Sequence, residues 1–141
     1  MTSNTSVRLA RRPAGLPVAD DWLIETAPVP DPGPGQFVVR THLISLDPAM
    51  RGWLDDRPSY LPPVGIGEVM RAMTVGEVIA SQHHRFGVGS MVLGTFGVQD
   101  YALSDGDGVT LVDSRLGTPS MYLGVLGTTG LTAYFGLMEL G

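Results

Sequence analysis

The sequence of 141 residues contains no cysteine. This absence excludes a disulfide framework, a thiolate nucleophile and a zinc site with cysteine ligands. It agrees with a cytoplasmic protein, which is the location that we expect. Lysine is also missing, so the chain can form no lysine Schiff base.

Positive charge is scarce and dispersed. The nine basic residues are all arginines, the formal net charge is −5, and the largest basic group is the pair Arg11-Arg12. A surface that follows nucleic-acid phosphates needs a concentrated basic patch. We therefore expect no nucleic-acid partner for this chain.

Long apolar runs are missing as well. No segment reaches the roughly 18 consecutive apolar residues that a membrane-spanning helix needs. The first residues, MTSNTSVRLARRP, include arginines but no apolar stretch of the kind found in secretory signals. We therefore expect no membrane partner, and a length of 141 residues fits one domain with a buried core.

Short strand-like runs alternate with turns along most of the chain. The 19 glycines and 11 prolines fall between runs rich in β-branched and aromatic residues. This pattern predicts a mainly β fold, a small barrel or sandwich. The dipeptide Phe96-Gly97 predicts a hairpin between the two runs beside it, and Gly76 suits a bulge or a close backbone approach. The predicted strands cover residues 7–10, 21–26, 36–45, 73–81, 90–95, 98–103 and 109–112.

The pattern changes to that of a helix near the C-terminal end. Residues 120–140 contain no proline and are almost continuously apolar. Leu131, Tyr134, Phe135 and Met138 follow the i, i+3, i+4, i+7 spacing of a helix face. A helix this apolar should be buried on most sides. Its partner would be a segment that follows it or a second copy of the chain, so a homodimer is one expectation.

The histidines and aspartates that could form a catalytic or metal site are better explained as residues of turns. His83 and His84 are adjacent and would point to opposite sides of a strand, so a solvated turn is favoured over a metal site. The pairs Asp55-Asp56 and Asp105-x-Asp107 lie in turn-rich loops, where aspartates bond their own backbone. We predict no metal site and no self-sufficient catalytic set.

Common cofactor and nucleophile motifs are also absent. The chain has no Gly-x-Ser-x-Gly, no Ser-x-x-Lys, no Walker pattern and no Gly-x-Gly-x-x-Gly. Gly87-x-Gly89 precedes a strand-like run and does not open a helix. The residues alone thus describe a mostly β domain with one apolar helix.

The order of several motifs resembles a known family across nearly the whole chain. Residues 47–52 (DPAMRG), residues 59–81 (SYLPPVGIGEVMRAMTVGEVIAS) and residues 130–137 (GLTAYFGL) carry the resemblance. They are similar to the zinc-independent medium-chain dehydrogenase/reductases. The branch is that of NADPH-dependent prostaglandin reductases, curcumin reductases and alkenal double-bond reductases.

This resemblance implies a GroES-like β-barrel as the substrate-binding domain over residues 1–120. Residues 121–141 would be a linker helix toward a Rossmann domain that is absent from this chain. Family members use NADPH to reduce the C=C bond of α,β-unsaturated aldehydes and ketones, so the substrate would be a small enal or enone. The isolated chain would then be inactive. The alternative is a stand-alone barrel that acts as a non-catalytic binding or dimerisation module.

The resemblance also implies site residues. Thr132, with Gly130 and Met50, would lie near the nicotinamide, although the Thr132 hydroxyl could instead bond a carbonyl of its own helix. Arg51 would donate to a carbonyl or phosphate, with a structural salt bridge as its alternative. At position 49 many family members have a tyrosine where this chain has alanine, so a phenol donor is lost. The substrate-binding residues implied are Ala49, Arg51, Tyr60, Glu68 and Met70, with no catalytic residue assigned.

Overall fold

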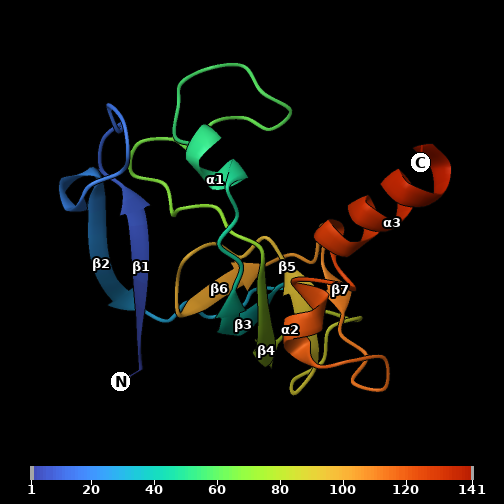
Figure 1. Cartoon of the computed structure of the whole chain (residues 1–141). Helices are drawn as coiled ribbons and strands as arrows, with labels where there is room; N and C mark the ends of the chain where they lie inside the picture. The colour runs from blue at the N-terminus through green and yellow to red at the C-terminus, as the bar shows by residue number, and fades with distance from the viewer. Residues whose placement is uncertain (1, 141) are drawn as a thin grey trace.

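A computed structural model describes residues 2–140 and shows a mainly β fold with short helices (Figure 1). Two strands form one antiparallel sheet, and five strands form a second in the order β6-β3-β4-β5-β7, with every pair antiparallel. The mainly β prediction is confirmed. The strands are β1 (Ser3–Leu9), β2 (Trp22–Pro28), β3 (Phe37–Ile44), β4 (Thr74–Ser81), β5 (Met91–Gly94), β6 (Tyr101–Ser104) and β7 (Thr110–Leu111); the helical segments are the 3-10 turn Ala19–Asp21, α1 (Ala49–Gly52), α2 (Pro119–Tyr122) and α3 (Thr128–Leu140).

Strand β1 joins the two sheets into a barrel. One edge of β1 pairs with β2. Along the other edge its backbone bonds two loop segments: the Leu9 amide donates to the Glu68 carbonyl at 3.0 Å, and the Val7 amide donates to the Val98 carbonyl at 2.9 Å. Both edges of β1 are therefore paired, which leaves few backbone groups open to another strand.

Gly76 confirms the close approach that the sequence predicted. Strand β3 shifts register between Thr41 and Leu43, opposite Gly76 and Val75 of β4. A side chain at Gly76 would collide with the Arg40 carbonyl oxygen. Only glycine lets the two backbones come this close at the bulge.

The hairpin predicted at Phe96-Gly97 is wrong. Strand β5 pairs with β4 and β7, whereas β6 pairs with β3, so the two runs are not neighbours. A two-residue hairpin of the common type needs a positive φ at both central residues or at the first. Here Gly97 has φ 79°, but no residue other than glycine has a positive φ in the described chain. Phe96 is instead buried in the core, and this burial draws the connection across the barrel.

Two apolar clusters fill the fold. The first lies between the strands of the large sheet and the loops that close it, and the second lies beneath α1. The first contains Phe37, Val39, Val78, Phe86, Val92, Phe96, Ala102 and Val109, and the second contains Leu9, Trp53, Leu54, Val64 and Met70. The second cluster fixes the loop that follows α1, and this loop forms one wall of the site described below.

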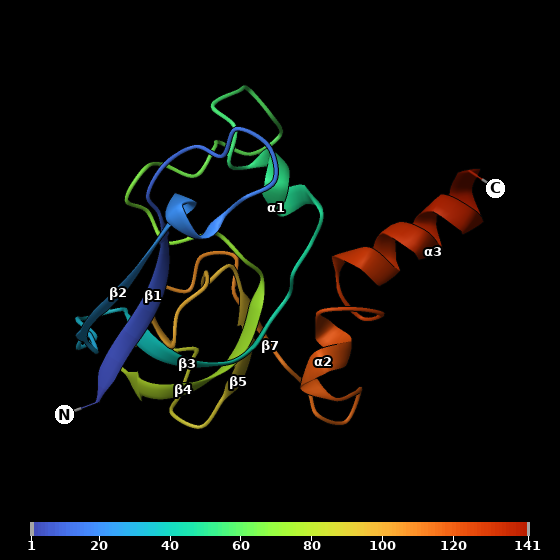
Figure 2. The ribbon, with the colours of Figure 1, turned by 60° about the vertical axis from the view of Figure 1, so that its left-hand side comes forward.

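Helix α3 extends away from the body of the molecule (Figure 2). The predicted helix face of Leu131, Tyr134, Phe135 and Met138 is confirmed as helical. None of these side chains is buried within the described residues, and Leu137 is 73% exposed, so the helix has no packing partner here. No other element within residues 2–140 reaches the outer turns of α3. Among the described residues no helix has the length and hydropathy required to cross a membrane.

Candidate functional site

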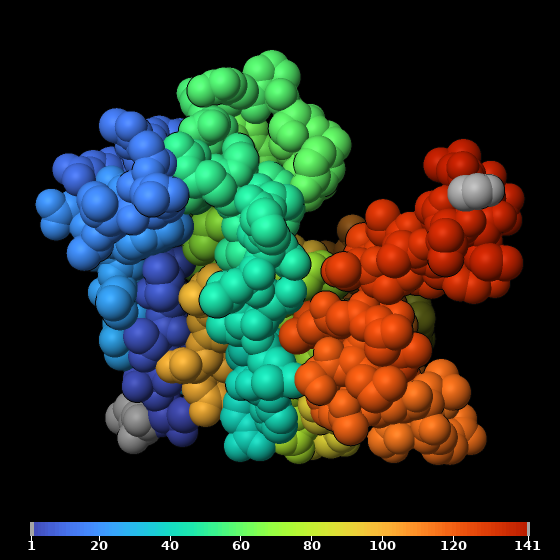
Figure 3. Space-filling model, in the orientation of Figure 1, coloured from blue at the N-terminus to red at the C-terminus, as the bar shows by residue number. Residues whose placement is uncertain are grey.

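A cleft of about 570 Å³ lies between the barrel and the first turns of α3. In the space-filling view the hollow is bordered by the loop after α1 and by α3 (Figure 3). Its walls are mainly apolar, with a few polar groups among them. A concave, mostly apolar site with a few convergent polar groups is the usual form of a small-molecule site. Its lining residues are Ser45, Asp47, Ala49, Trp53, Tyr60, Leu61, Arg71, Met73, Leu93, Thr95, Tyr122, Leu123, Thr128, Thr129, Thr132 and Ala133.

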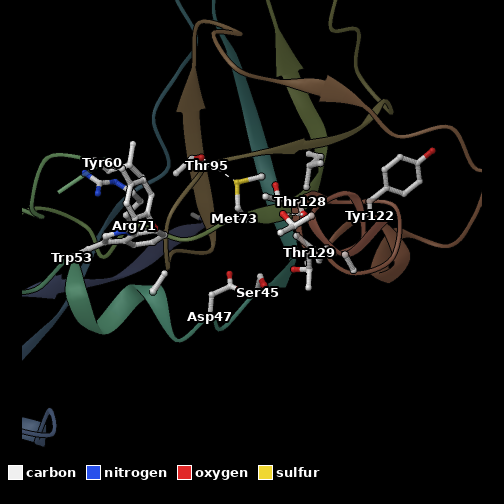
Figure 4. Close-up of a pocket in the computed structure, with 16 residues that line it drawn as sticks. Ser45, Asp47, Trp53, Tyr60, Arg71, Met73, Thr95, Tyr122, Thr128 and Thr129 are labelled. Atoms are coloured by element: carbon white, nitrogen blue, oxygen red, sulfur yellow. Dashed lines mark hydrogen bonds between the residues drawn. The ribbon is translucent and has the colours of Figure 1, made fainter. Parts of the chain in front are cut away.

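One wall of the cleft is a group of three stacked or bonded side chains, Trp53, Tyr60 and Arg71 (Figure 4). The indole N–H of Trp53 donates to the Tyr60 hydroxyl oxygen at 3.2 Å. The Arg71 guanidinium lies over the Trp53 ring, 5.4 Å from its centroid, in a cation–π arrangement. Arg71 is itself fixed, because it donates to the Pro62 carbonyl at 2.8 Å.

The opposite wall comes from α2 and α3. Thr128, Thr129 and Thr132 face the cleft from the start of α3. The Thr132 hydroxyl donates to the Thr128 carbonyl at 2.7 Å, which is the intrahelical bond expected of a threonine in a helix. Tyr122 of α2 is also held in place: its hydroxyl donates to the Asp113 carbonyl at 2.9 Å and accepts from the Asp113 amide at 3.0 Å.

Three of the sequence-predicted site residues line this cleft together: Ala49, Tyr60 and Thr132. Met50, Arg51 and Met70 line a separate apolar groove of about 360 Å³, bordered also by Leu16 and Trp22. That groove and the cleft share no lining residue. The structure therefore divides the predicted set between two hollows.

Arg51 forms the salt bridge that was its alternative interpretation. Its guanidinium contacts the Asp55 carboxylate at 2.9 Å and donates to the Gly15 carbonyl at 2.9 Å. The hydrogen bond from Arg51 holds the pKa of the Asp55 carboxyl below its ordinary value. Arg51 thereby ties the loop before β2 to α1.

Two further predicted residues have backbone roles. The Glu68 carboxylate accepts from the Gly65 amide at 2.8 Å and closes a tight turn. At Gly130 a side chain would collide with the Val125 carbonyl, so glycine is needed where α3 begins to pack on the preceding turn. Neither residue lines the cleft.

Of the other polar candidates, the Asp105 carboxylate accepts from the Asp107 amide at 3.1 Å, so its predicted turn role is confirmed. His83 is more than a solvated turn residue, because its ring lies 4.9 Å from Phe86 and 5.6 Å from Phe37. No group of three potential metal ligands gathers within residues 2–140.

Sequence reasoning missed several lining residues, among them Asp47 and Arg71. Asp47 stands in the DPAMRG motif, and this position alone could have marked it as a candidate. Arg71 has no local signal, since its place beside Trp53 depends on the folding of the 17 residues between them.

Comparisons with known proteins agree with this architecture. Residues 5–112 match the family described as the N-terminal domain of oxidoreductase. The chain is 47% identical over 94% of its length to the NADPH-dependent curcumin reductase of Escherichia coli (strain K12), and it covers 39% of that protein. The crystal structure of CurA from Vibrio vulnificus superposes with a TM-score of 0.88 at 45% identity, covering 96% of this chain and 40% of that one. CurA in complex with NADPH gives a TM-score of 0.87 at 43% identity, with the same coverage.

The chain thus spans about 40% of the length of these relatives. The match of the family model covers most of the barrel, from β1 to β7. The resemblance to the curcumin reductase branch and to its barrel fold is confirmed. The chain belongs to the family of N-terminal domains of oxidoreductases.

Proposed function

We propose that the chain is the substrate-binding domain of an NADPH-dependent oxidoreductase that reduces the C=C bond of α,β-unsaturated aldehydes and ketones. The observation that carries this proposal is the mainly apolar cleft of about 570 Å³ between the barrel and α3. Its size suits a small enal or enone, and its apolar walls keep water away from a reacting centre. The relatives named as NADPH-dependent curcumin reductase and as CurA in complex with NADPH support the choice of cofactor.

The reaction needs specific properties of the chain's own side chains. NADPH, when bound, supplies the hydride that adds to the β-carbon of the substrate. Charge then develops on the carbonyl oxygen, and hydrogen-bond donors in the cleft stabilise it. The polar groups among the apolar walls, such as Ser45, Tyr60 and Arg71, are suited to this task.

The threonines of α3 fit one end of the nicotinamide. The donor set of Thr128, Thr129 and Thr132 offers hydroxyls that can both donate to and accept from a carboxamide. Because the Thr132 proton is used in the bond to Thr128, its oxygen is left to accept. Gly130 keeps this turn of α3 close to the preceding segment. Met50 of α1 would support the cleft indirectly, by packing against the core cluster that contains Trp53.

The substrate side of the proposal divides into lining and supporting residues. Ala49 and Tyr60 would contact the substrate directly. Arg51, Glu68 and Met70 would hold the loops that carry them, through the ion pair, the turn and the core packing already described. We infer that residues 1–120 form this binding unit and that residues 121–141 link it to a cofactor-binding unit.

We further infer that the isolated chain does not catalyse the reaction. It lacks the glycine-rich fingerprint that holds a dinucleotide pyrophosphate. The test is NADPH oxidation followed by absorbance at 340 nm, with 4-phenylbut-3-en-2-one as the substrate. No turnover is expected, and measurable consumption would overturn the inferred inactivity.

Binding of the same ketone tests the cleft itself. Ala133 of α3 lines the cleft, so Ala133→Trp should fill part of it and weaken ketone binding in an NMR titration. Leu137→Trp, on the same helix but outside the cleft, is the matched control and should leave binding unchanged. Equal effects of the two variants would contradict the assignment of the cleft as the substrate site.

A second candidate is a stand-alone barrel that dimerises through α3. The exposed apolar side chains of α3, including Tyr134, Phe135 and Leu137, favour it. Analytical ultracentrifugation across a hundredfold concentration range discriminates the two. A concentration-dependent monomer–dimer equilibrium that is abolished by Leu137→Glu supports pairing, and a strict monomer excludes it.

A further inference from the structure

The Tyr60 hydroxyl differs from those of Tyr122, Thr132 and Thr95 in the cleft, because its proton is not used in a bond within residues 2–140. The hydroxyls of Tyr122 and Thr132 donate to backbone carbonyls, and that of Thr95 donates to the Met73 sulfur at 3.2 Å. The Tyr60 oxygen, in contrast, is an acceptor of the Trp53 indole N–H. Since the indole is a donor only, the phenol proton must point elsewhere.

The side chains around Tyr60 restrict the position of its hydroxyl group at the edge of the cleft. Trp53 is buried in the cluster beneath α1, and Arg71 lies over its ring while donating to Pro62. The Tyr60 side chain itself is 73% exposed and lines the cleft. In the close-up Tyr60, Trp53 and Arg71 stand together on one side of the cleft (Figure 4). A rigid donor held by a buried partner loses little conformational freedom when it binds a ligand.

Chemistry favours this phenol over the remaining hydroxyls, such as Ser45 and Thr128. A phenol is a stronger hydrogen-bond donor than an alkyl alcohol, because its ring spreads the charge that remains on the oxygen. Ala49, also a lining residue, has only a methyl group and leaves space in the cleft. A carbonyl group can therefore approach without displacing a bulky side chain.

We propose that Tyr60 donates the hydrogen bond that recognises the carbonyl oxygen of the ligand, with Trp53 and Arg71 as its positioning residues. This inference rests on the proposed function and names the group that selects a carbonyl compound over a hydrocarbon of the same shape. It assigns to Tyr60 a hydrogen bond and no proton transfer. The same bond strengthens when negative charge develops on the oxygen.

The test compares two ligands with one carbon skeleton, 4-phenylbut-3-en-2-one and trans-1-phenyl-1-butene. Both are titrated into the whole chain labelled with ¹⁵N, and the indole N–H signal of Trp53 is followed beside that of Trp22. Tyr60→Phe should weaken ketone binding about three- to tenfold, the value of one neutral hydrogen bond, and change hydrocarbon binding less than about twofold. The Trp53 indole signal should also shift in the free variant, because its acceptor is removed.

The control is Tyr134→Phe, which removes a phenol from α3 outside the cleft and should leave both affinities unchanged. Equal weakening of ketone and hydrocarbon by Tyr60→Phe would show a packing role and overturn the inference. Unchanged ketone binding in that variant would overturn it as well, while leaving the proposed function intact. If the native chain binds neither ligand at millimolar concentration, the cleft assignment and the inference fail together.

Discussion

The barrel and α3 both contain large apolar side chains, yet they bury them very differently. Phe37 in the barrel is fully buried between strands, whereas Phe135 in α3 is 54% exposed. Strands of the barrel find partners within residues 2–140, and the outer turns of α3 do not. An apolar composition thus indicates that a helix or strand requires a packing partner, but it does not show whether the same chain contains that partner.

The largest expected contrast is between matched phenylalanines in the two regions. Phe37→Ala should lower the free energy of unfolding by about 3–5 kcal/mol, because it leaves a cavity in the core. Phe135→Ala should change it by less than about 0.5 kcal/mol, as for an ordinary exposed site. Urea denaturation followed by tryptophan fluorescence measures both. A large loss in Phe135→Ala would mean that α3 is packed in solution.

A pair of glycines gives the next contrast. Gly76→Ala should destabilise the barrel by about 1–3 kcal/mol, since the added methyl group meets the Arg40 backbone and one strand must shift. Gly136 of α3 has open space around it, so Gly136→Ala should favour the helix by about 1 kcal/mol. Thermal unfolding measures the first change, and the helical circular dichroism signal measures the second. If Gly76→Ala and Gly136→Ala changed stability by the same amount in the same direction, the predicted difference between the two glycine sites would be wrong.

The smallest expected effect concerns pH and the buried carboxylate of Asp21 in the turn before β2. The backbone amide of Val18 at 2.8 Å and the guanidinium of Arg11 at 2.7 Å hold the pKa of this carboxyl below its ordinary value. A folded-state pKa below the unfolded value of about 3.9 stabilises the fold above that pH. This stabilisation is lost as the pH falls through the folded-state value.

Asp21→Asn should therefore be less stable than the native chain at pH 7, and the difference should shrink below about pH 4. Asp56→Asn makes the same change of net charge at an exposed carboxylate without an ion pair in the described chain, and it serves as the control. Urea midpoints between pH 2.5 and 7 measure the difference. A constant difference across this range would contradict the assigned role of Asp21.

Local patterns explain which elements could be predicted. The strand over residues 36–45 was foreseen because β-branched residues such as Val38 and Val39 favour extended backbone, and β3 is found at Phe37–Ile44. The helical spacing from Leu131 to Met138 likewise predicted the helix that is found as α3. The hairpin at Phe96-Gly97 failed because the burial of Phe96 outweighed the local turn signal.

The candidate site was predictable only in part. Ala49, Tyr60 and Thr132 were identified through a family resemblance and do line one cleft. Ala49 and Thr132 are more than 80 residues apart, and their spacing in the sequence does not indicate that they line the same cleft. Arg71 was missed for the same reason, because its contact with Trp53 arises from the path of the intervening loop.

By itself the sequence determined the mainly β character, the apolar helix and the absence of thiol and lysine chemistry, because propensity and composition are local properties. Only the tertiary structure decided which strands pair, since backbone bonds such as that between Val7 and Val98 join residues far apart in the chain. It also decided that α3 stays exposed and that the Trp53 indole N–H donates to the Tyr60 hydroxyl oxygen. Long-range contacts depend on the packing of the whole chain, and no short stretch of residues specifies them.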